Sequence, residues 1–431
     1  MKLINKKFFI ITLGCRVNIL ESNNIIEELT KKGAIHTTNI NLANFCIINT
    51  CCVTNNADKK SKLEIQYACN KKNIKLVVVI GCYSQLNHAL ITNKKVGIIL
   101  GTKFKTKLAK IINKWKVNKK IILIEDVKKN QKFEDYSITK FNNHTRAFLK
   151  IQDGCNYDCS YCLIPQSRGS QRSMKFEKVI FSIKKLINNN FKEIILTGVN
   201  TAGYNDGVHD FYDLLLAIDR IRGDFRIRIS SLEPFQITNK IIDLLTKNKR
   251  RWVQSFHICL QSTSDKILKS MRRRYTFNKF KKLCEYIKKK SPLASITTDY
   301  IVGYPSETLK EFNNSIEKIK KLKLANMHIF RYSKRKNTVA EKITDIVGDA
   351  ERKRRFEIIN NLNIEMKNNY FKKFINKRIS ILFENSSDSS VQIGHSNYFF
   401  TVKVISNINM QNILKEVIIT KIQNNELYGI I

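Results

Sequence analysis

Three cysteines lie close together in one loop, and their spacing suits a metal cluster. They are Cys155, Cys159 and Cys162, in the segment IQDGCNYDCSYCLIPQSRG. Three thiolates with this C-x3-C-x2-C spacing can bind three irons of a four-iron cluster. The fourth iron then has no protein ligand and can bind a small molecule through an amine and a carboxylate. S-adenosylmethionine offers both groups, and an electron from the cluster would cleave it to a 5′-deoxyadenosyl radical.

A zinc ion is the alternative ligand for this loop. Structural zinc is usually held by four protein side chains. No further Cys or His follows soon after the loop, and His144 lies several residues before it. Tyr161, directly before the last cysteine, offers an aromatic ring that can stack on an adenine or meet it edge-on. The spacing and this ring together favour the iron–sulfur cluster.

A second set of cysteines follows predicted strands in the first part of the chain: Cys15, Cys51 and Cys82. Parallel strands end at the same edge of a sheet, so these thiols are expected to converge and hold a second cluster with one open iron. Ordinary buried cysteines are the alternative. We favour that alternative for Cys46 and Cys69, while Cys52 is ambiguous because it adjoins Cys51.

The elements that carry these cysteines alternate between strand and helix patterns. Within residues 1–125, we predict a helix at 21–33 and strands at 8–15, 45–51, 75–82 and 96–101. This alternation predicts an α/β domain with a parallel sheet. Residues 126–143 are polar and have no clear period, so they are predicted to be a linker.

The alternation resumes over residues 144–374, with predicted strands at 193–200, 225–234, 254–262, 296–305 and 327–333. This pattern predicts a partial (β/α) barrel whose site lies at the carboxyl ends of the strands. Residues 375–431 contain only short strand patterns, which predict a small β-barrel. Three aromatic residues in this last segment are candidates for stacking on RNA bases: Tyr398, Phe399 and Phe400.

Several residues at predicted strand ends are candidates for contact with the cofactor. Gly198 and Asn200 follow one strand, where a glycine lets a ligand approach the backbone, and Gln261 and Gly303 follow two others. Glu233 can accept hydrogen bonds from ribose hydroxyls. A structural role at the barrel rim is the alternative for each of these residues.

The chain is strongly basic. Its 77 Lys and Arg against 36 Asp and Glu give a net charge of +41, which favours a polyanionic partner such as nucleic acid. A lysine bias from an AT-rich genome is the alternative explanation. Arg168 and Arg172, just after the cysteine loop, are candidates to meet substrate phosphates or the carboxylate of the cofactor.

The compartment is predicted from what the chain lacks. It shows no signal peptide and no run of about 18 apolar residues, so we expect a cytoplasmic protein without a membrane span. In that reducing compartment, cysteines serve metals or catalysis more often than disulfides.

The motif C-x3-C-x-aromatic-C, which follows the strand pattern AFLKIQ, resembles the signature of the radical S-adenosylmethionine superfamily. Two sets of three cysteines in one chain resemble the methylthiotransferases of that superfamily, and the likeness covers nearly the whole chain, including a terminal barrel of the TRAM kind. Segments that resemble the MtaB-type branch are TLGCRVNILES, NTCCVTNNADKKS, LTGVNTAGY, and LQSTSD with MRRRYT. Departures from the family pattern are Cys259, Thr263, Ser306 and the segment 331–338.

The resemblance implies a transferase that adds a methylthio group to C2 of N6-threonylcarbamoyladenosine at position 37 of tRNA, next to the anticodon. It implies S-adenosylmethionine and two [4Fe–4S] clusters, the first starting the radical reaction and the second supplying sulfur. Expected partners are the anticodon stem-loop of tRNA and an electron donor such as flavodoxin or ferredoxin, and we expect a monomer. The alternatives are a methylthiotransferase for isopentenyladenosine of tRNA or for a ribosomal-protein aspartate, and a non-catalytic iron–sulfur protein that binds RNA.

Overall fold

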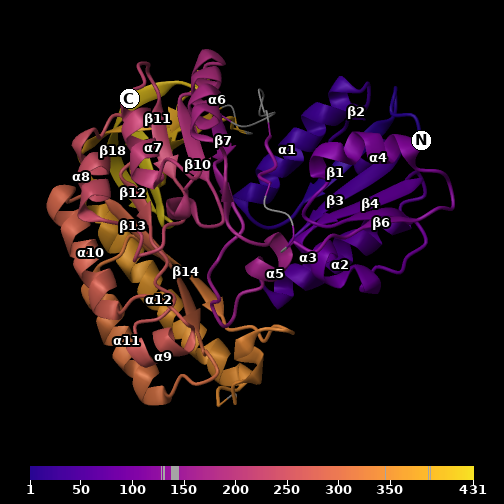
Figure 1. The fold of residues 1–431 in the computed structure, drawn as a ribbon. Coiled ribbons are helices and arrows are strands. Elements are labelled where there is room, and N and C mark those ends of the chain that lie inside the picture. Colours follow the sequence, from indigo (N-terminus) through magenta and orange to yellow (C-terminus); the bar gives the residue numbers. More distant parts are fainter. Residues whose placement is uncertain (128, 130–131, 137–144, 345, 387, 389) are drawn as a thin grey trace.

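The computed structural model describes residues 1–431 except 128, 130–131, 137–144, 345, 387 and 389. In chain order it contains a parallel sheet with helices, a partial (β/α) barrel and a small closed β-barrel (Figure 1). This architecture confirms the predicted fold class. The boundaries at residues 125, 143 and 374 stay predictions, and part of the predicted linker lies outside the described residues. None of the described helices is long and apolar enough to cross a membrane.

The first sheet has six parallel strands, in the order β2 (Ile35–His36), β1 (Lys7–Thr12), β3 (Phe45–Thr50), β4 (Leu76–Gly81), β5 (Val96–Leu100) and β6 (Ile121–Leu123). Its main helices are α1 (Arg16–Lys31), α2 (Asn55–Asn70), α3 (Cys82–Asn87) and α4 (Leu108–Lys114). Helices α1 and α4 pack on one face of the sheet, and α2 and α3 on the other. Strands β3, β4 and β5 are buried along their whole length, which explains their continuous apolar sequences.

The partial barrel has six parallel strands: β7 (Arg146–Lys150), β10 (Glu193–Thr197), β11 (Arg226–Ile229), β12 (Ser255–His257), β13 (Ser295–Val302) and β14 (Asn326–Arg331). Two three-stranded sheets are joined through the parallel bridges Ile227↔Trp252 and Leu232↔Ile258. Its larger helices are α6 (Phe176–Asn188), α7 (Phe211–Asp219), α8 (Asn239–Lys247), α10 (Phe277–Lys290), α11 (Leu309–Leu322) and α12 (Asp349–Lys372). Shorter elements lie at the carboxyl ends of the strands: β8 (Gln152–Asp153), α5 (Ile164–Arg168), β9 (Arg172–Ser173) and α9 (Asp265–Ser270).

The C-terminal strands close into a barrel in the order β15 (Arg378–Phe383), β16 (Val391–Ser396), β17 (Thr401–Ile405), β19 (Glu426–Ile430) and β18 (Leu414–Gln423). Alternate residues such as Ile379, Ile381, Val402 and Val404 fill its interior. Closure leaves this small sheet without free edges.

The small barrel docks on the amino ends of the partial-barrel strands, opposite the cysteine loop. The backbone N–H of Gln254 donates to the carbonyl of Asn397 (2.7 Å), and Arg226 donates to the carbonyl of His395 (2.8 Å). Arg146, at the start of β7, pairs with Glu384 at 2.7 Å. The small barrel therefore covers the floor of the partial barrel.

The aromatic run of the small barrel, residues 398–400, packs against other elements of the chain. Phe400 is buried beside Phe374, with ring centroids 4.6 Å apart, and the ring of Tyr398 lies 5.0 Å from the same phenylalanine. Phe399 lies in the turn between β16 and β17, under the guanidinium of Arg228. Phe400 is therefore a core residue, whereas base stacking by the half-buried rings of Tyr398 and Phe399 stays a prediction.

Replacing Phe374 by Ala should loosen the small barrel. The side chain is fully buried between the end of α12 and the barrel core, so its loss should cost about 3–5 kcal/mol of local stability. Hydrogen exchange of the β15–β19 amides should accelerate accordingly. Phe181→Ala is the matched control, since that ring is 65% exposed; equal protection of the barrel in both variants would contradict this packing role.

Candidate functional site

The loop with Cys155, Cys159 and Cys162 lies at the carboxyl ends of the barrel strands, between β8 and α5. Each sulfur accepts a hydrogen bond from nitrogen. The backbone N–H of Tyr157 donates to Cys155, Arg273 donates to the Sγ of Cys159 (3.2 Å), and the N–H of Ile164 donates to the Sγ of Cys162 (3.5 Å). Such donors suit sulfurs that carry negative charge as cluster ligands.

The N-terminal cysteines come together at the carboxyl edge of the first sheet. Cys15 precedes α1, Cys51 follows β3, and Cys82 begins α3 after β4. Gly14 allows the close approach, because it has a positive φ of 91° and an added β-carbon would lie 2.6 Å from the Sγ of Cys51. The charges of the three thiols act on one another's pKa, as expected of neighbours in space.

The surroundings of the thiols in this second set shift their pKa values in different directions. Burial raises the pKa of Cys51 to about 12. The pKa of Cys82 is lowered to about 6, because the Cys52 thiol donates a hydrogen bond to it and the charges of Arg168 and Lys105 favour its thiolate despite burial. Cys52 is thus a buried partner of Cys82.

Each set of cysteines offers three thiols, whereas a structural zinc site usually takes four protein ligands. Zinc–sulfur bonds of about 2.3 Å place the sulfurs of a tetrahedral site roughly 4 Å apart. Within the described part of the chain, the one group of three candidate ligands that lie within 4.8 Å of one another is His257, Cys259 and Asp299. A [4Fe–4S] cluster needs only three thiolates when one iron stays open to another ligand, so each set of three cysteines fits the cluster better than a structural zinc ion.

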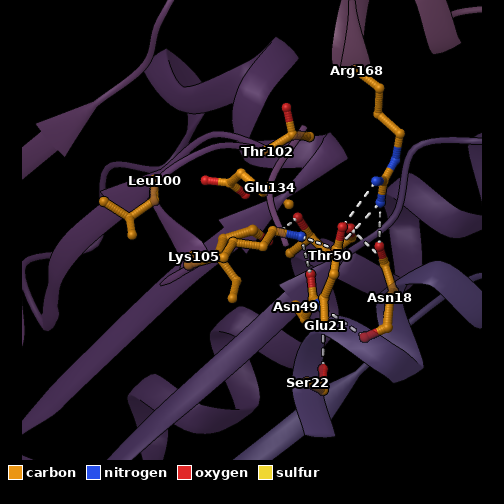
Figure 2. A network of polar contacts seen from close by, with 12 residues as sticks. Asn18, Glu21, Ser22, Asn49, Thr50, Leu100, Thr102, Lys105, Glu134 and Arg168 are labelled. Atoms are coloured by element: carbon orange, nitrogen blue, oxygen red, sulfur yellow. Dashed lines mark hydrogen bonds and ion pairs between the residues drawn. The ribbon is translucent and has the colours of Figure 1, made fainter. Parts of the chain in front are cut away.

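A buried ion network joins the two sets of cysteines. Glu21 of α1 lies between Arg168 and Lys105 (Figure 2). Arg168 donates to Glu21 at 3.0 Å and to Asn18 at 2.8 Å, while Lys105 donates to Glu21 and, at 3.1 Å, to Asn49. Arg168 ends α5, which follows the cysteine loop, and α1 follows Cys15. This network fixes the cysteine loop against the first sheet.

Asp153 extends the network to the other side of the loop. It accepts hydrogen bonds from Arg168 (3.1 Å), from Arg172 (3.0 Å) and from Lys150 (3.1 Å). Both arginines are buried, and Arg168 is only 1% exposed. The expectation that Arg168 and Arg172 meet phosphates or the cofactor carboxylate is therefore wrong, because carboxylates of this chain already pair with them.

Tyr161 and Glu233 lie beside the cysteine loop with an arginine that the sequence analysis did not single out. Arg273 forms an ion pair with Glu233 and also donates to Cys159. Burial raises the pKa of Glu233 and of Tyr161, and Arg273 opposes the rise for both. The segment MRRRYT contains three arginines in a row, and all three reach the loop: Arg272 pairs with Asp158 at 2.8 Å, and Arg274 lies over the ring of Tyr157. Only the fold shows that Arg273 is the one that bonds a cysteine sulfur.

The remaining predicted contacts lie at separate strand ends. Gly198 and Asn200 both lie next to the side chain of Gln152. The Oε1 atom of Gln152 accepts a hydrogen bond from the N–H of Asn200 at 2.7 Å. A β-carbon added at position 198 would lie 2.9 Å from the same oxygen. Gln261 adopts a positive φ of 65° beside β13. Gly303 bonds Glu307 and Arg352 of this chain. Their roles toward a cofactor stay predictions.

Two family models match this chain, and each match covers one of the two sets of cysteines. Residues 149–319 match the model of the radical SAM superfamily, and residues 7–101 match the uncharacterized protein family UPF0004. The first region contains the loop at 155–162, and the second contains Cys15, Cys51 and Cys82.

Several curated proteins are similar over nearly their whole length. The threonylcarbamoyladenosine tRNA methylthiotransferase MtaB of Bacillus subtilis is 34% identical, over 91% of this chain and 88% of that protein. MtaB of Aquifex aeolicus is 31% identical over 86% of this chain and 91% of its own. The tRNA-2-methylthio-N(6)-dimethylallyladenosine synthase of Pelagibacter ubique is 31% identical over 98% and 97%.

A solved structure shares the fold at low sequence identity. The radical S-adenosylmethionine methyltransferase TsrM from Kitasatospora setae superposes with a TM-score of 0.55 at 13% identity, covering 75% of this chain and 72% of that one. This likeness supports the arrangement of the partial barrel.

Glu21→Gln should destabilise the protein in a pH-dependent way. Burial alone would raise the pKa of Glu21, but Arg168, Lys105 and Lys150 outweigh it and lower the pKa from 4.5 to about 2. Its stabilisation is therefore complete above about pH 4.5 and is lost as the pH falls toward 2. At pH 7 the variant should lose about 3–5 kcal/mol in urea unfolding, because buried cations are left unpaired.

The gap between wild type and Glu21→Gln should close between pH 4.5 and pH 2. Glu28→Gln on the same helix is the matched control, since Glu28 forms only an exposed pair with Lys31 and should change stability by less than about 1 kcal/mol. A gap of equal size at pH 3 and pH 7 would contradict the ionised state of Glu21.

Proposed function

Because the chain belongs to the radical S-adenosylmethionine methylthiotransferase family, we propose that it adds a methylthio group to C2 of N6-threonylcarbamoyladenosine at position 37 of tRNA, next to the anticodon. It is a transferase, and its cofactors are S-adenosylmethionine and [4Fe–4S] clusters. The relative from Bacillus subtilis carries the name of this activity. Cytoplasmic location, a monomeric state and a flavodoxin- or ferredoxin-like electron donor stay predictions.

Each set of cysteines has its own task in this proposal. Cys155, Cys159 and Cys162 hold one cluster, and Cys15, Cys51 and Cys82 hold the other. Bound there, the first cluster would supply the electron that cleaves S-adenosylmethionine, and the second would supply the sulfur. The protein brings the substrate base to both, since the hydrogen at C2 of adenine is neither acidic nor polarised and acid–base catalysis cannot remove it.

The observation that carries the proposal is the position of Arg168. This side chain lies six residues beyond Cys162, yet it donates at 2.8 Å to Asn18, which in turn donates at 3.0 Å to the carbonyl of Thr50, directly before Cys51. The radical loop and the N-terminal cysteines therefore flank one buried network. Hydrogen removal and sulfur insertion occur at the same carbon, so this proximity suits a two-cluster reaction.

The charge of the small barrel and the names of the relatives bear on the choice among substrates. The small barrel has five Lys and Arg against four acids, so it is not an acidic surface for a basic ribosomal protein. Relatives with dimethylallyladenosine in their names match at similar identity. The alternative tRNA substrate must therefore be tested directly.

Nucleoside mass spectrometry tests the substrate. The chain is expressed in a bacterial strain that lacks its own methylthiotransferases, and the tRNA is digested to nucleosides. We expect the methylthio form of N6-threonylcarbamoyladenosine, absent from the empty-vector strain. The methylthio form of dimethylallyladenosine alone, or an unchanged tRNA pool with a methylthiolated ribosomal protein, would refute the proposed substrate.

Single-cysteine variants test the two tasks. Wild type should hold about eight irons after reconstitution, and Cys155→Ala and Cys51→Ala about four each. Cys155→Ala should cleave no S-adenosylmethionine, whereas Cys51→Ala should still release 5′-deoxyadenosine without a methylthio product. Cys69→Ala, at a buried cysteine of α2, is the control and should keep about eight irons. Full iron content in Cys51→Ala would overturn the second cluster assignment.

A further inference from the structure

Two arginines inside the partial barrel have no carboxylate partner within the described part of the chain. Arg228 projects from β11 and is 4% exposed, and its Nε and Nη1 find no hydrogen-bond acceptor. Arg16, the first residue of α1, is half-buried and lies near the same place. Both arginines act on His328 of β14, whose pKa is lowered by burial first, then by His257 and by these two charges.

The neighbouring acids are already engaged. Glu193 pairs with Arg226 at 2.7 Å, Glu384 pairs with Arg146 at 2.7 Å, and Asp299 lies 3.3 Å from the ring nitrogen of His257. Only Oε1 of Glu193 has no hydrogen-bond partner among these described contacts. The four arginines of this region, Arg16, Arg146, Arg226 and Arg228, therefore outnumber the carboxylates that can neutralise them. Burial lowers the pKa of Arg228 and the charges of the other three arginines lower it further, while the charge of Glu193 opposes this shift.

Phe399 of the small barrel forms the floor below these charges. Its ring lies under the guanidinium of Arg228, and the guanidinium carbons of Arg16 and Arg146 are 5.7 Å and 5.5 Å from the ring centroid. A guanidinium stacked on a ring keeps its N–H groups free in its own plane. Those N–H groups can donate hydrogen bonds to a planar anion that lies in the plane of the guanidinium.

A buried guanidinium without an anion is costly. Arginine does not lose its proton in proteins, and an uncompensated buried charge costs several kcal/mol. Carboxylates match the arginine fork with two parallel hydrogen bonds. The unpaired N–H groups of Arg228 therefore point to a bound carboxylate that this chain does not itself supply.

We infer that Arg16 and Arg228 bind the carboxylate of the threonylcarbamoyl group of the substrate. This inference rests on the proposed function and adds a specificity site to it. Arg16 directly follows Cys15 of the sulfur-donating set, so the anion would lie close to the reacting base. A dimethylallyl group carries no charge and would leave both guanidinium groups unpaired.

The carboxylate of S-adenosylmethionine is a poorer candidate for this site. It would bind the open iron at the loop with Cys155, beside Glu233. Arg228 precedes Glu233 by five residues in the chain, a span of up to about 16 Å in extended backbone. Arg228, within β11, thus lies deeper in the barrel than the cofactor's amino-acid end, which meets the loop beyond the carboxyl ends of the strands.

Binding of anticodon stem-loop RNAs tests the inference independently of turnover. The RNAs carry at position 37 either N6-threonylcarbamoyladenosine, its methyl ester, dimethylallyladenosine or adenosine, and affinity to the cluster-loaded protein is measured by fluorescence anisotropy. Wild type should bind the acid about tenfold to a hundredfold more tightly than the methyl ester, as expected for charge-assisted hydrogen bonds. Arg16→Gln and Arg228→Gln should each lose most of that preference.

Two comparisons guard against misfolding. Each variant should bind the adenosine RNA within about twofold of wild type and keep its iron content, and Arg228→Lys should retain part of the preference. Arg222→Gln, at an exposed arginine before β11, is the matched control and should keep all of it.

The outcomes separate the inference from the proposed function. Equal binding of acid and ester by wild type, or full preference in Arg16→Gln and Arg228→Gln, would overturn the inference while leaving the substrate to the nucleoside measurement. Tighter binding of the dimethylallyl RNA than of the acid would overturn both.

Discussion

The ion pair between Glu21 and Arg168 is the interaction on which the arrangement of the whole site depends. Glu21 belongs to the helix that follows Cys15, and Arg168 to the helix that follows Cys162. The two side chains are fully buried and meet at 3.0 Å. Buried charges tolerate little misalignment, because each is stable only with its partner in place. The pair therefore positions two chemically distinct sets of thiols relative to one another.

The two ends of the partial barrel differ in how their buried charges are balanced. At the carboxyl ends of the strands, Glu21 and Asp153 share their charge with four surrounding cations, Arg168, Arg172, Lys105 and Lys150. Near the floor, Arg16 and Arg228 have no such partners. The small barrel takes part in this arrangement, since the ring of Phe399 packs under Arg228 and lies near Arg16 and Arg146. A structural appendage thus shapes the inside of the catalytic domain.

Much of the fold was predictable because strands buried on both faces leave continuous apolar runs. That signal locates β3, β4 and β5. It fails for short edge strands such as β2 and for β16, whose sequence VQIGHS is largely polar. It also misplaces the start of α1, which begins at Arg16 and not at residue 21. The extra turn places Arg16 near the barrel interior.

Sequence alone determined which residues can carry the chemistry, since thiol spacing in a loop and cysteines at strand ends are local patterns. Only the tertiary structure decided how charges pair. Glu21 and Arg168 are 147 residues apart, and no periodicity marks such a pair. The same holds for Arg168, whose proximity to the cysteine loop suggested an anion-binding role that its buried partners rule out. Arg228 shows the converse, because an arginine in a strand acquires a role only when the fold buries it and leaves it without an acid.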